Sequence, residues 1–406
     1  MTDTRAPKVE RRSDVLVIGG GPSGLRVAGR LAGRGLDVRV LEKKPAIGRN
    51  VVCTGIIGKD VFARFGLDPG SIIQEIRDVR LVSPFGTSLT YSHPRPFACV
   101  VDRETFDAGI AAAAESAGAT VSLESRVEDL TIEPDGVRAR VGTKDDGVVC
   151  YSAAMAVIAC GVDIGLQKRA GLGYPRDFLQ GAQAEVPVRE GELTTIFIGR
   201  SVAPGAFAWS VPAGDKARVG LLTKKDPASL LRILLGKTGA PGGSRARDKG
   251  EVRIRRKAVA QGLLPRTTGD RVLSVGEAAG QIKTTTGGGI SYGLLCADLA
   301  AEAIFGCFER SSFGAGALAG YEAAWRKAIQ KEIIVGYTTR RMCSRLSDRQ
   351  VQGLFHLAQT DGIIPIIRET ADFDWHSGLI AALLRRLSFM KSFRTMRDAV
   401  EKNVLS

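Results

Sequence analysis

The pattern of apolar and polar residues predicts that the chain begins with a strand, a helix and a second strand. An apolar run over 13–20 leads into helical spacing of apolar residues over 22–34, and a short apolar run follows over 37–42. Continuous apolar runs are typical of buried parallel strands, whereas amphipathic helices repeat every 3.6 residues. The start of the chain is therefore predicted to be a βαβ unit.

Beyond this unit the pattern alternates between helical and strand-like stretches, which predicts a mixed architecture. The predicted elements are, in order, a helix over 102–118, strands over 119–123, 137–141 and 154–161, an antiparallel sheet over 175–225, an irregular stretch over 226–250, a strand from 272, a helix over 288–308, and helices from 321 onward.

A glycine-rich turn joins the first strand to the first helix. It has the form G-x-G-x-x-G, with Gly19, Gly21 and Gly24 enclosing Pro22 and Ser23. The three glycines permit a tight turn, close approach of a pyrophosphate, and close helix–strand packing. The turn therefore predicts a dinucleotide site at the start of the helix.

An acidic residue, Glu42, ends the second strand, where a carboxylate can accept hydrogen bonds from an adenosine ribose. We assign the adjacent Lys43 to the same site. Lys43 and Lys44 also leave open a 2′-phosphate and hence NADP, but Glu42 in the ribose position disfavours that alternative.

A second glycine-rich element lies some 250 residues later, after the strand that starts at Val272. It contains Gly276, Glu277 and Gly280, and the run Gly287, Gly288, Gly289 and Ile290 follows. Glu277 can accept a ribityl hydroxyl, and consecutive glycines let backbone N–H groups approach a flat ring edge. Two such elements fit one long dinucleotide held at both ends, which predicts FAD rather than NAD.

Together, the elements and motifs predict an α/β fold (α+β overall). We expect a discontinuous Rossmann-like FAD-binding domain, an inserted antiparallel-sheet substrate domain and a helical C-terminal region. The predicted boundaries are 1–60, 99–165 and 263–312 for the FAD-binding domain, 61–98 and 166–262 for the substrate domain, and 313–406 for the helical region.

The chain is strongly basic, with a formal net charge of +14. Basic residues cluster over 245–257, over 340–349 and over 385–397. Such clusters are compatible with a solvated face, an anionic substrate or an acidic lipid surface. A nucleic-acid partner is not expected, since only 6% of residues are aromatic and no recognition motif is visible.

The remaining composition is that of a globular protein, with 44% apolar and 25% charged residues. No uninterrupted apolar run reaches about 18 residues, and the polar N-terminus does not resemble a secretory signal. Seven scattered cysteines without a C-x-x-C pair indicate reduced thiols, and the three histidines lack ligand spacing. We therefore expect a cytoplasmic protein without a metal site, associated at most peripherally with the inner face of a membrane.

Four segments, together with the first glycine-rich turn, resemble the geranylgeranyl reductase family of flavoproteins, within the p-hydroxybenzoate hydroxylase-like superfamily. These segments are 48–55, 101–107, 205–212 and 276–293. They occur in the family's order and cover roughly the first 300 residues. The departures are Glu277 in place of aspartate, Phe207 in place of tyrosine, and Cys160 where the superfamily often has aspartate.

The resemblance implies roles for several residues. Cys53 would lie near the flavin, as a proton donor or as a residue that shapes the pocket, and Arg103 would contact the cofactor. Phe207 and Trp209 alternate in a predicted strand, so both point to one face. That face is interpreted either as part of an apolar tunnel for an isoprenoid chain or as ordinary core.

The resemblance also implies the reaction, in which reduced FAD reduces carbon–carbon double bonds of a polyprenyl (geranylgeranyl) substrate by hydride transfer from N5. The substrate would be an isoprenoid or prenyl lipid, and NADPH, ferredoxin or another electron-donor protein would supply electrons. Two alternatives stay open, namely an FAD-dependent monooxygenase or halogenase and an electron-transfer flavoprotein to quinone. The tail over 378–400 is interpreted as one helix, either packed or lying on lipid.

Overall fold

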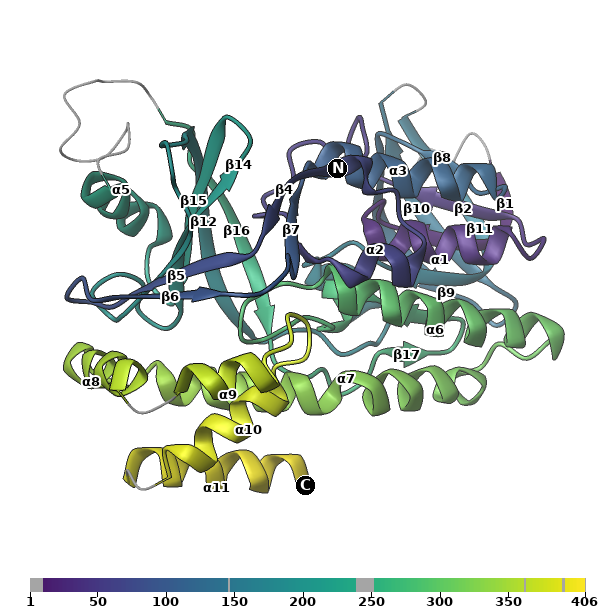
Figure 1. Ribbon diagram of the computed structural model, residues 1–406. Coiled ribbons are helices and arrows are strands. Elements are labelled where there is room, and N and C mark those ends of the chain that lie inside the picture. The colour runs from purple at the N-terminus through teal and green to yellow at the C-terminus, as the bar shows by residue number, and fades with distance from the viewer. Residues whose placement is uncertain (1–9, 145–146, 239–251, 361–362, 389–390, 406) are drawn as a thin grey trace.

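The computed structural model describes residues 10–144, 147–238, 252–360, 363–388 and 391–405. Within them the strands form three sheets of eight, seven and three strands, and the chain passes repeatedly between the two larger sheets (Figure 1). The mixed α/β architecture predicted from the sequence is confirmed.

The eight-stranded sheet has a parallel centre. Its main path is β17 (Thr268–Gly269), β18 (Val272–Ser274), β11 (Gly147–Ile158), β1 (Glu10–Ile18), β2 (Val38–Leu41) and β8 (Thr120–Ser122). The strands β9 (Ser125–Ile132) and β10 (Val137–Thr143) continue antiparallel from β11. β18, β11, β1, β2 and β8 run parallel, so their carboxyl ends meet at one edge.

Helices cover one face of this sheet and the β9–β10 hairpin covers the other. The first core cluster joins Val15 and Val17 of β1 to the helices α1 (Pro22–Ala32), α3 (Arg103–Ser116) and α6 (Ile290–Glu309). The second joins Leu16 and Ile18 to β10 and to α4 (Ile164–Arg169). Successive residues of β1 thus enter opposite cores, which explains the continuous apolar run in the sequence.

The seven-stranded sheet is antiparallel except where β13 pairs with β5. Its order is β16 (Arg255–Gln261), β12 (Asp177–Pro187), β15 (Lys216–Thr223), β14 (Phe207–Ala213), β13 (Thr194–Ile198), β5 (Asp78–Val82) and β6 (Ser88–Ser92). Between the large sheets lies a small one of β3 (Ile56–Gly58), β7 (Ala98–Val101) and β4 (Ile72–Ile76), near the short helices α2 (Asp60–Phe65) and η1 (Pro69–Ser71).

One face of the seven-stranded sheet packs on a helix that the sequence pattern missed. The stretch 226–250 was predicted to be irregular, but Pro227–Thr238 forms α5. Leu231, Leu234 and Leu235 of α5 are buried against Ala182 and Val219 of the sheet. This helical spacing of leucines outweighs the flanking Pro and Gly. Residues 239–251, with three of the seven basic residues of the first basic cluster, lie outside the described residues.

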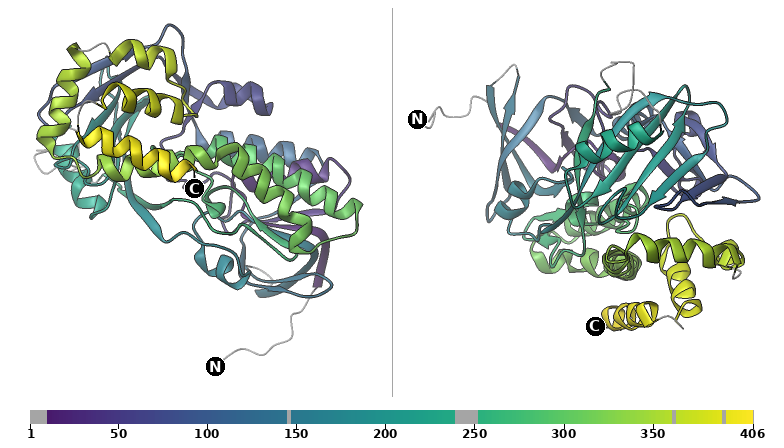
Figure 2. Two further views of the ribbon diagram at one scale, coloured as in Figure 1. Left: turned by 90° about the horizontal axis from the view of Figure 1, so that it is seen from below. Right: turned by 90° about the vertical axis from the view of Figure 1, so that its left-hand side faces the viewer.

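The chain ends in helices, as predicted. They are α7 (Ala315–Cys343), α8 (Asp348–Thr360), α9 (Ile363–Thr370), α10 (Ser377–Arg386) and α11 (Lys391–Leu405). α7 runs along both larger sheets, and Figure 2 shows the later helices gathered on the side of the seven-stranded sheet. The tail predicted as one helix is two, and Leu384 and Leu387 pack inward against Met396 and Val400. Residues 389–390 of this tail lie outside the described residues.

One helix of the described residues, α6, is long and apolar enough to cross a membrane. However, 61% of its most apolar 18-residue window is buried inside the protein. This burial reflects packing against α1 and α7 in the core beside the eight-stranded sheet.

Candidate functional site

A cleft of about 520 Å³ lies at the carboxyl edge of the parallel strands. It brings together thirteen of the residues predicted from the sequence: Gly19, Gly21, Pro22, Ser23, Glu42, Lys43, Cys53, Arg103, Glu277, Gly287, Gly288, Gly289 and Ile290. Parallel sheets bind ligands at this edge, because loops diverge there and helix N-termini point toward it.

The glycines of the first turn differ in what surrounds them. Gly19 has φ +114°, and a Cβ there would lie 2.5 Å from the carbonyl oxygen of Ala159. A Cβ on Gly24 would lie 2.2 Å from the carbonyl oxygen of Gly19, so this residue allows α1 to pack on its strand. A Cβ on Gly21 would meet nothing within 4 Å. Gly21 therefore leaves open space in front of the helix.

Two long helices begin at the cleft without a side-chain cap. α1 follows Gly21 and α6 follows Gly289, and neither capping residue forms a side-chain hydrogen bond to the first turn. The first N–H groups of a helix need acceptors, and the helix dipole favours negative charge there. The cleft therefore presents donors for an anionic or electron-rich group at two places.

Glu42 holds the loop around the first turn. Its carboxylate accepts hydrogen bonds from Gly20 N at 2.7 Å and Lys44 N at 2.9 Å. A carboxylate oxygen can accept a further hydrogen bond, so a ribose hydroxyl can share the site. Burial lowers the pKa of Lys44, although Glu42 opposes this shift.

The second glycine-rich element forms the short helix η2 (Gly276–Ala279) and its flanks. Gly276 and Gly280 both have positive φ, and a Cβ on Gly276 would lie 2.6 Å from Ser23 Oγ. Neither glycine lines the cleft; they shape the turn that places Glu277 there. Lys257 Nζ of β16 lies 2.8 Å from Glu277 Oε2, so this carboxylate already has a cationic partner.

Cys53 lies in a turn whose backbone is held by side chains of the seven-stranded sheet. Arg218 Nη1 donates hydrogen bonds to the carbonyl oxygens of Thr54 at 2.7 Å and Val101 at 3.0 Å. Gln183 Nε2 donates to the carbonyl oxygen of Cys53 at 3.2 Å. Arg218 and Gln183 were not predicted from the sequence. Their signal is a polar residue on the inward-facing side of an otherwise apolar strand.

Arg103 lies beside Cys53 at the start of α3. It forms an ion pair with the buried Asp107 at 2.8 Å. Burial disfavours its charge, but Cys53 and Asp107 outweigh this effect and raise the pKa of Arg103. Arg103 therefore stays cationic next to the thiol. Across the cleft, burial raises the pKa of Cys160 to about 12, so that side chain is a neutral thiol.

A loop between α9 and α10 closes another part of the cleft, and the sequence analysis assigned it no role. Its Asp374 lies 2.8 Å from Lys283 Nζ, and both side chains line the cleft and are buried. Lys283 Nζ also donates to the carbonyl oxygen of Phe373 at 3.1 Å, and Tyr292 donates to that of Asp374 at 2.7 Å. The C-terminal region is therefore part of the site.

Phe207 and Trp209 point to one face of β14, with ring centroids 5.7 Å apart. They do not line the cleft. They belong to an apolar cluster that also contains Ile56 and Ile282, and these two isoleucines do line it. The Nε1 atom of Trp209 is buried without a hydrogen-bond partner. The aromatic pair thus belongs to the cluster behind Ile56 and Ile282 of the cleft wall, and its catalytic role stays a prediction.

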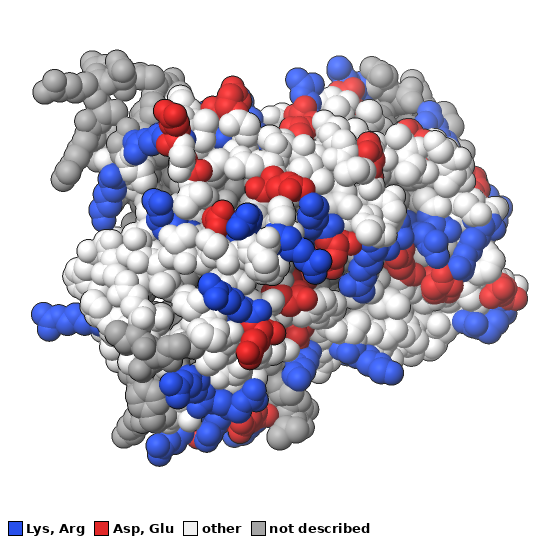
Figure 3. Space-filling view, viewed as in Figure 1, with Lys and Arg blue, Asp and Glu red and all other residues white. Residues whose placement is uncertain are grey.

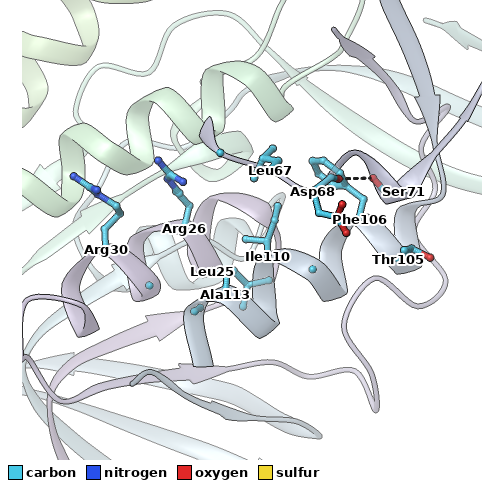
Figure 4. A pocket seen from close by; sticks show the side chains of 14 residues that line it. Leu25, Arg26, Arg30, Leu67, Asp68, Ser71, Thr105, Phe106, Ile110 and Ala113 are labelled. Carbon is cyan, nitrogen blue, oxygen red and sulfur yellow. Dashed lines mark hydrogen bonds between the residues drawn. The ribbon is translucent and has the colours of Figure 1, made fainter. Parts of the chain in front are cut away.

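A separate groove of about 330 Å³ lies between α1 and α3 (Figure 4). Leu25, Ile110 and Ala113 line it, and Arg26 and Arg30 project at one end. None of the predicted site residues lines this groove, which makes the cleft the candidate active site.

The cleft fits FAD on three observations. Gly21 leaves free space before α1, the uncapped helices α1 and α6 face the cleft, and Glu42 and Glu277 lie at different parts of it. The free space before α1 and the uncapped helix starts provide sites for a pyrophosphate and for a flat ring edge. The carboxylates of Glu42 and Glu277 can accept hydrogen bonds from sugar hydroxyls. The roles of individual residues stay predictions.

Comparison with known proteins also supports FAD as the cofactor. A family model described as an FAD binding domain matches residues 14–57. The chain is 31% identical over 358 residues to digeranylgeranylglycerophospholipid reductase 2 of Methanothermobacter thermautotrophicus, covering 84% of this chain and 90% of that protein. It is 29% identical to digeranylgeranylglycerophospholipid reductase of Methanothrix thermoacetophila, covering 87% and 93%.

Solved structures share the fold. A geranylgeranyl bacteriochlorophyll reductase-like protein from Thermoplasma acidophilum aligns with a TM-score of 0.83 at 22% identity, covering 96% of this chain and all of that one. The p-nitrophenol 4-monooxygenase of Pseudomonas putida aligns with a TM-score of 0.72 at 19% identity, covering 89% and 97%. Reductases and oxygenases therefore share this architecture.

Proposed function

This chain belongs to the geranylgeranyl reductase family of FAD-dependent flavoproteins, and from this premise we propose that its substrate is a membrane lipid with geranylgeranyl-type chains and a phosphate head group. The protein is an FAD-dependent oxidoreductase that reduces carbon–carbon double bonds of a polyprenyl chain. The lipid identity rests on the names of these relatives, which cover most of the chain.

Reduction of a double bond adds a hydride to one carbon and a proton to the other. When bound in its reduced form, FAD supplies the hydride. Gly21, Glu42, Glu277 and the glycine run before α6 would hold the cofactor. The chain must also keep the alkene in place, because reacting atoms need to lie about 3–3.5 Å apart.

The proton comes from the side of the cleft that carries Cys53. Arg218 and Gln183 bind the backbone carbonyls of Thr54 and Cys53, so the turn that carries the thiol cannot move away from the seven-stranded sheet without breaking two hydrogen bonds. The Arg103 cation beside it stabilises the thiolate left after proton transfer. Cys53 then takes a proton from water before the next double bond is reduced. This arrangement is the observation that supports proton donation by Cys53.

The apolar cluster around Trp209 provides the surface for the prenyl chain. Ile56 and Ile282 connect it to the cleft, so the chain can leave the reaction centre along apolar side chains. The loop with Phe373 packs on the same cluster and shields it from water.

We further propose a cytoplasmic enzyme that meets its lipid at the inner face of the membrane. Figure 3 shows Lys and Arg gathered over α10 and α11. The leucines of α10 face inward, so attraction to acidic lipid would depend on this basic face rather than on insertion of an apolar stripe. Arg340 does not contribute, since it is buried beside Asp177.

The test is anaerobic incubation of chemically reduced protein with geranylgeranyl diphosphate and with digeranylgeranyl phospholipid. We expect products that gain two hydrogens per double bond, with one equivalent of flavin oxidised for each. Unchanged substrates with the flavin still reduced would contradict the proposal. Oxygen consumption driven by NADPH, with an oxygenated product, would instead support a monooxygenase.

Cys53→Ser tests the proton donor, and Cys150→Ser, in β11 outside the cleft, is its matched control. General acid catalysis contributes roughly 10²–10⁴-fold, so C53S should slow the single-turnover rate by about 10²-fold or more. FAD affinity and melting temperature should stay unchanged in both variants. Equal rates for C53S and C150S would rule out a role for the thiol.

A further inference from the structure

A second cavity, of about 860 Å³, adjoins the cleft on the far side of Cys53. Gly48, Val51, Cys53 and Arg103 line both spaces. A ligand in the second cavity therefore lies directly next to the thiol that faces the cofactor cleft. The mechanism above leaves this cavity without a function.

The edge strand β16 contributes basic side chains to both spaces. Arg255 and Lys257 are two residues apart in β16, and Arg253 precedes them at the same spacing. Side chains two residues apart in a strand share a face. Arg253 and Arg255 line the second cavity, whereas Lys257 lines the cleft. Arg255 and Lys257 of the strand, with Arg253 just before it, thus place cations in both the second cavity and the cleft.

These cations differ in their partners. Lys257 is paired with Glu277, as described above. The backbone of Arg255 pairs with Gln183 of β12, but within the described part of the chain neither the Arg253 nor the Arg255 side chain has a hydrogen bond or an ion pair. Arg218, deeper in the cavity, is held by backbone carbonyls and by Glu185 at 3.6 Å. The two arginines are therefore available to a ligand.

The carboxylates of the cavity do not neutralise this pair. Glu185 lies near Arg218 and Lys216, and Asp102 accepts a hydrogen bond from Thr105 N at the start of α3. Glu104 and Asp215 are exposed at the rim. Two arginines that both line a cavity large enough for a small molecule form a surface suited to a phosphate, since guanidinium groups bind phosphate oxygens through paired hydrogen bonds.

We propose that Arg253 and Arg255 bind the phosphate group of the prenyl substrate. The phosphate lies in the second cavity, and the prenyl chain passes Cys53 toward the cofactor cleft and the apolar cluster. This inference rests on the proposed function. It assigns the polar end of the substrate to β16 and accounts for two unpaired arginines at this edge.

The experiment uses the FAD-loaded protein and the double variant Arg253→Gln/Arg255→Gln. Arg256→Gln is the matched control, because Arg256 lies on the opposite face of β16, near Asp226 at 3.7 Å. Inorganic pyrophosphate and geranylgeranyl diphosphate are titrated into the oxidised proteins by calorimetry. Hydrogen bonds to charged groups are worth enough that the double variant should bind both about tenfold to a hundredfold more weakly. R256Q should bind both as the wild type does.

Steady-state kinetics distinguish binding of the phosphate head group from binding of the prenyl chain. In the double variant, KM for geranylgeranyl diphosphate should rise about tenfold or more, whereas KM for uncharged geranylgeraniol and kcat for both should not change. Equal pyrophosphate affinity in the wild type and the double variant would overturn the inference. So would an equal loss of FAD affinity in the double variant, which would place the arginines at the cofactor.

Competition identifies the source of the phosphate. Geranylgeranyl diphosphate should displace pyrophosphate from the wild-type protein, and displacement by NADPH alone would overturn the assignment to the prenyl substrate. If the wild type reduces no prenyl compound, the proposed function fails, yet the pyrophosphate titration still shows whether the arginines bind an anion. The two failures are thus distinguishable.

Discussion

The indole ring of Trp209 lies over Gly220 of the neighbouring strand, 2.5 Å from the position that a Cβ on Gly220 would occupy. The two residues are directly paired in the β14–β15 ladder. The absence of a side chain at Gly220 therefore allows the ring to lie flat against the sheet. The carbonyl oxygen of Ala182 is also close to this position, at 2.8 Å, so a new methyl group has no free direction.

Gly220→Ala should therefore displace Trp209. Extra methyl groups in a packed core cost about 1–3 kcal/mol, and we expect a loss of stability in this range. Thermal unfolding and a shift of the tryptophan fluorescence measure the effect. The control is Gly109→Ala on the exposed side of α3, where a Cβ would meet nothing within 4 Å; it should be neutral or stabilising by about 0.5–1 kcal/mol. An unchanged spectrum in G220A would contradict the expected displacement.

The ion pair between Lys283 and Asp374 joins the segment before α6 to the loop between α9 and α10, and both side chains are less than 10% exposed. Asp374→Asn would leave a buried ammonium group without a counter-charge. Breaking such a pair costs about 3–5 kcal/mol, so we expect a large drop in melting temperature and weaker FAD binding. Calorimetry and flavin fluorescence measure the two effects.

Two comparisons make this prediction specific. Glu75→Gln removes the exposed partner of Lys59 and should cost about 1 kcal/mol or less. The double variant Lys283→Met/Asp374→Leu should recover much of the lost stability, because replacing both partners removes the unpaired charge. If D374N were no more harmful than E75Q, the buried pair would not stabilise this loop.

His376 makes the same loop sensitive to pH. Burial and the nearby charge of Lys283 lower the pKa of His376 below its usual value of 6.5, and Glu332 and Asp374 oppose the shift only in part. The neutral ring bonds to Thr285 Oγ1 at 2.5 Å and to the carbonyl oxygen of Phe373 at 2.9 Å. The unfolded chain therefore binds a proton more readily than the folded chain just below pH 6.5.

Stability should accordingly fall as the pH decreases below 6.5, with a contribution from His376 of up to about 1.4 kcal/mol per pH unit. Above pH 6.5 both states carry a neutral ring, and the contribution of His376 is constant. Thermal unfolding between pH 5 and pH 8 measures the slope, and His376→Gln should make it less steep. An identical slope in the two proteins would contradict the lowered pKa.

Local patterns predicted those parts of the molecule that depend on neighbours in sequence. The run around β1, the helix after Gly21 and the strand ending before Glu42 agree with the structure, because strand and helix periodicity are local properties. The helix α5 was missed because Pro227 and Gly236 suggested a loop, whereas its leucines pack on a sheet that the pattern alone does not place.

The candidate site was predicted only in part for a related reason. Its glycines and acidic residues lie in short motifs, which carry their own signal. Lys283 and Asp374 are 91 positions apart, and Arg218 reaches a carbonyl 164 positions away. Burial of such charged residues depends on a partner brought close by the fold, so no local pattern distinguishes them from surface residues.

The two ends of the first glycine turn should respond differently to the same substitution. Gly24→Ala places a methyl group 2.2 Å from the carbonyl oxygen of Gly19, a backbone atom that cannot move without parting α1 from β1. We expect G24A to lower the melting temperature of the protein even without cofactor.

The methyl group of Gly21→Ala would meet nothing within 4 Å, so the apoprotein should keep its stability. The new methyl group would instead occupy the space before α1 where the pyrophosphate is predicted to lie, and FAD affinity should fall at least about tenfold. Melting of the apoprotein and FAD titration separate the two effects. Wild-type FAD affinity in G21A would show that the cofactor does not use this helix start.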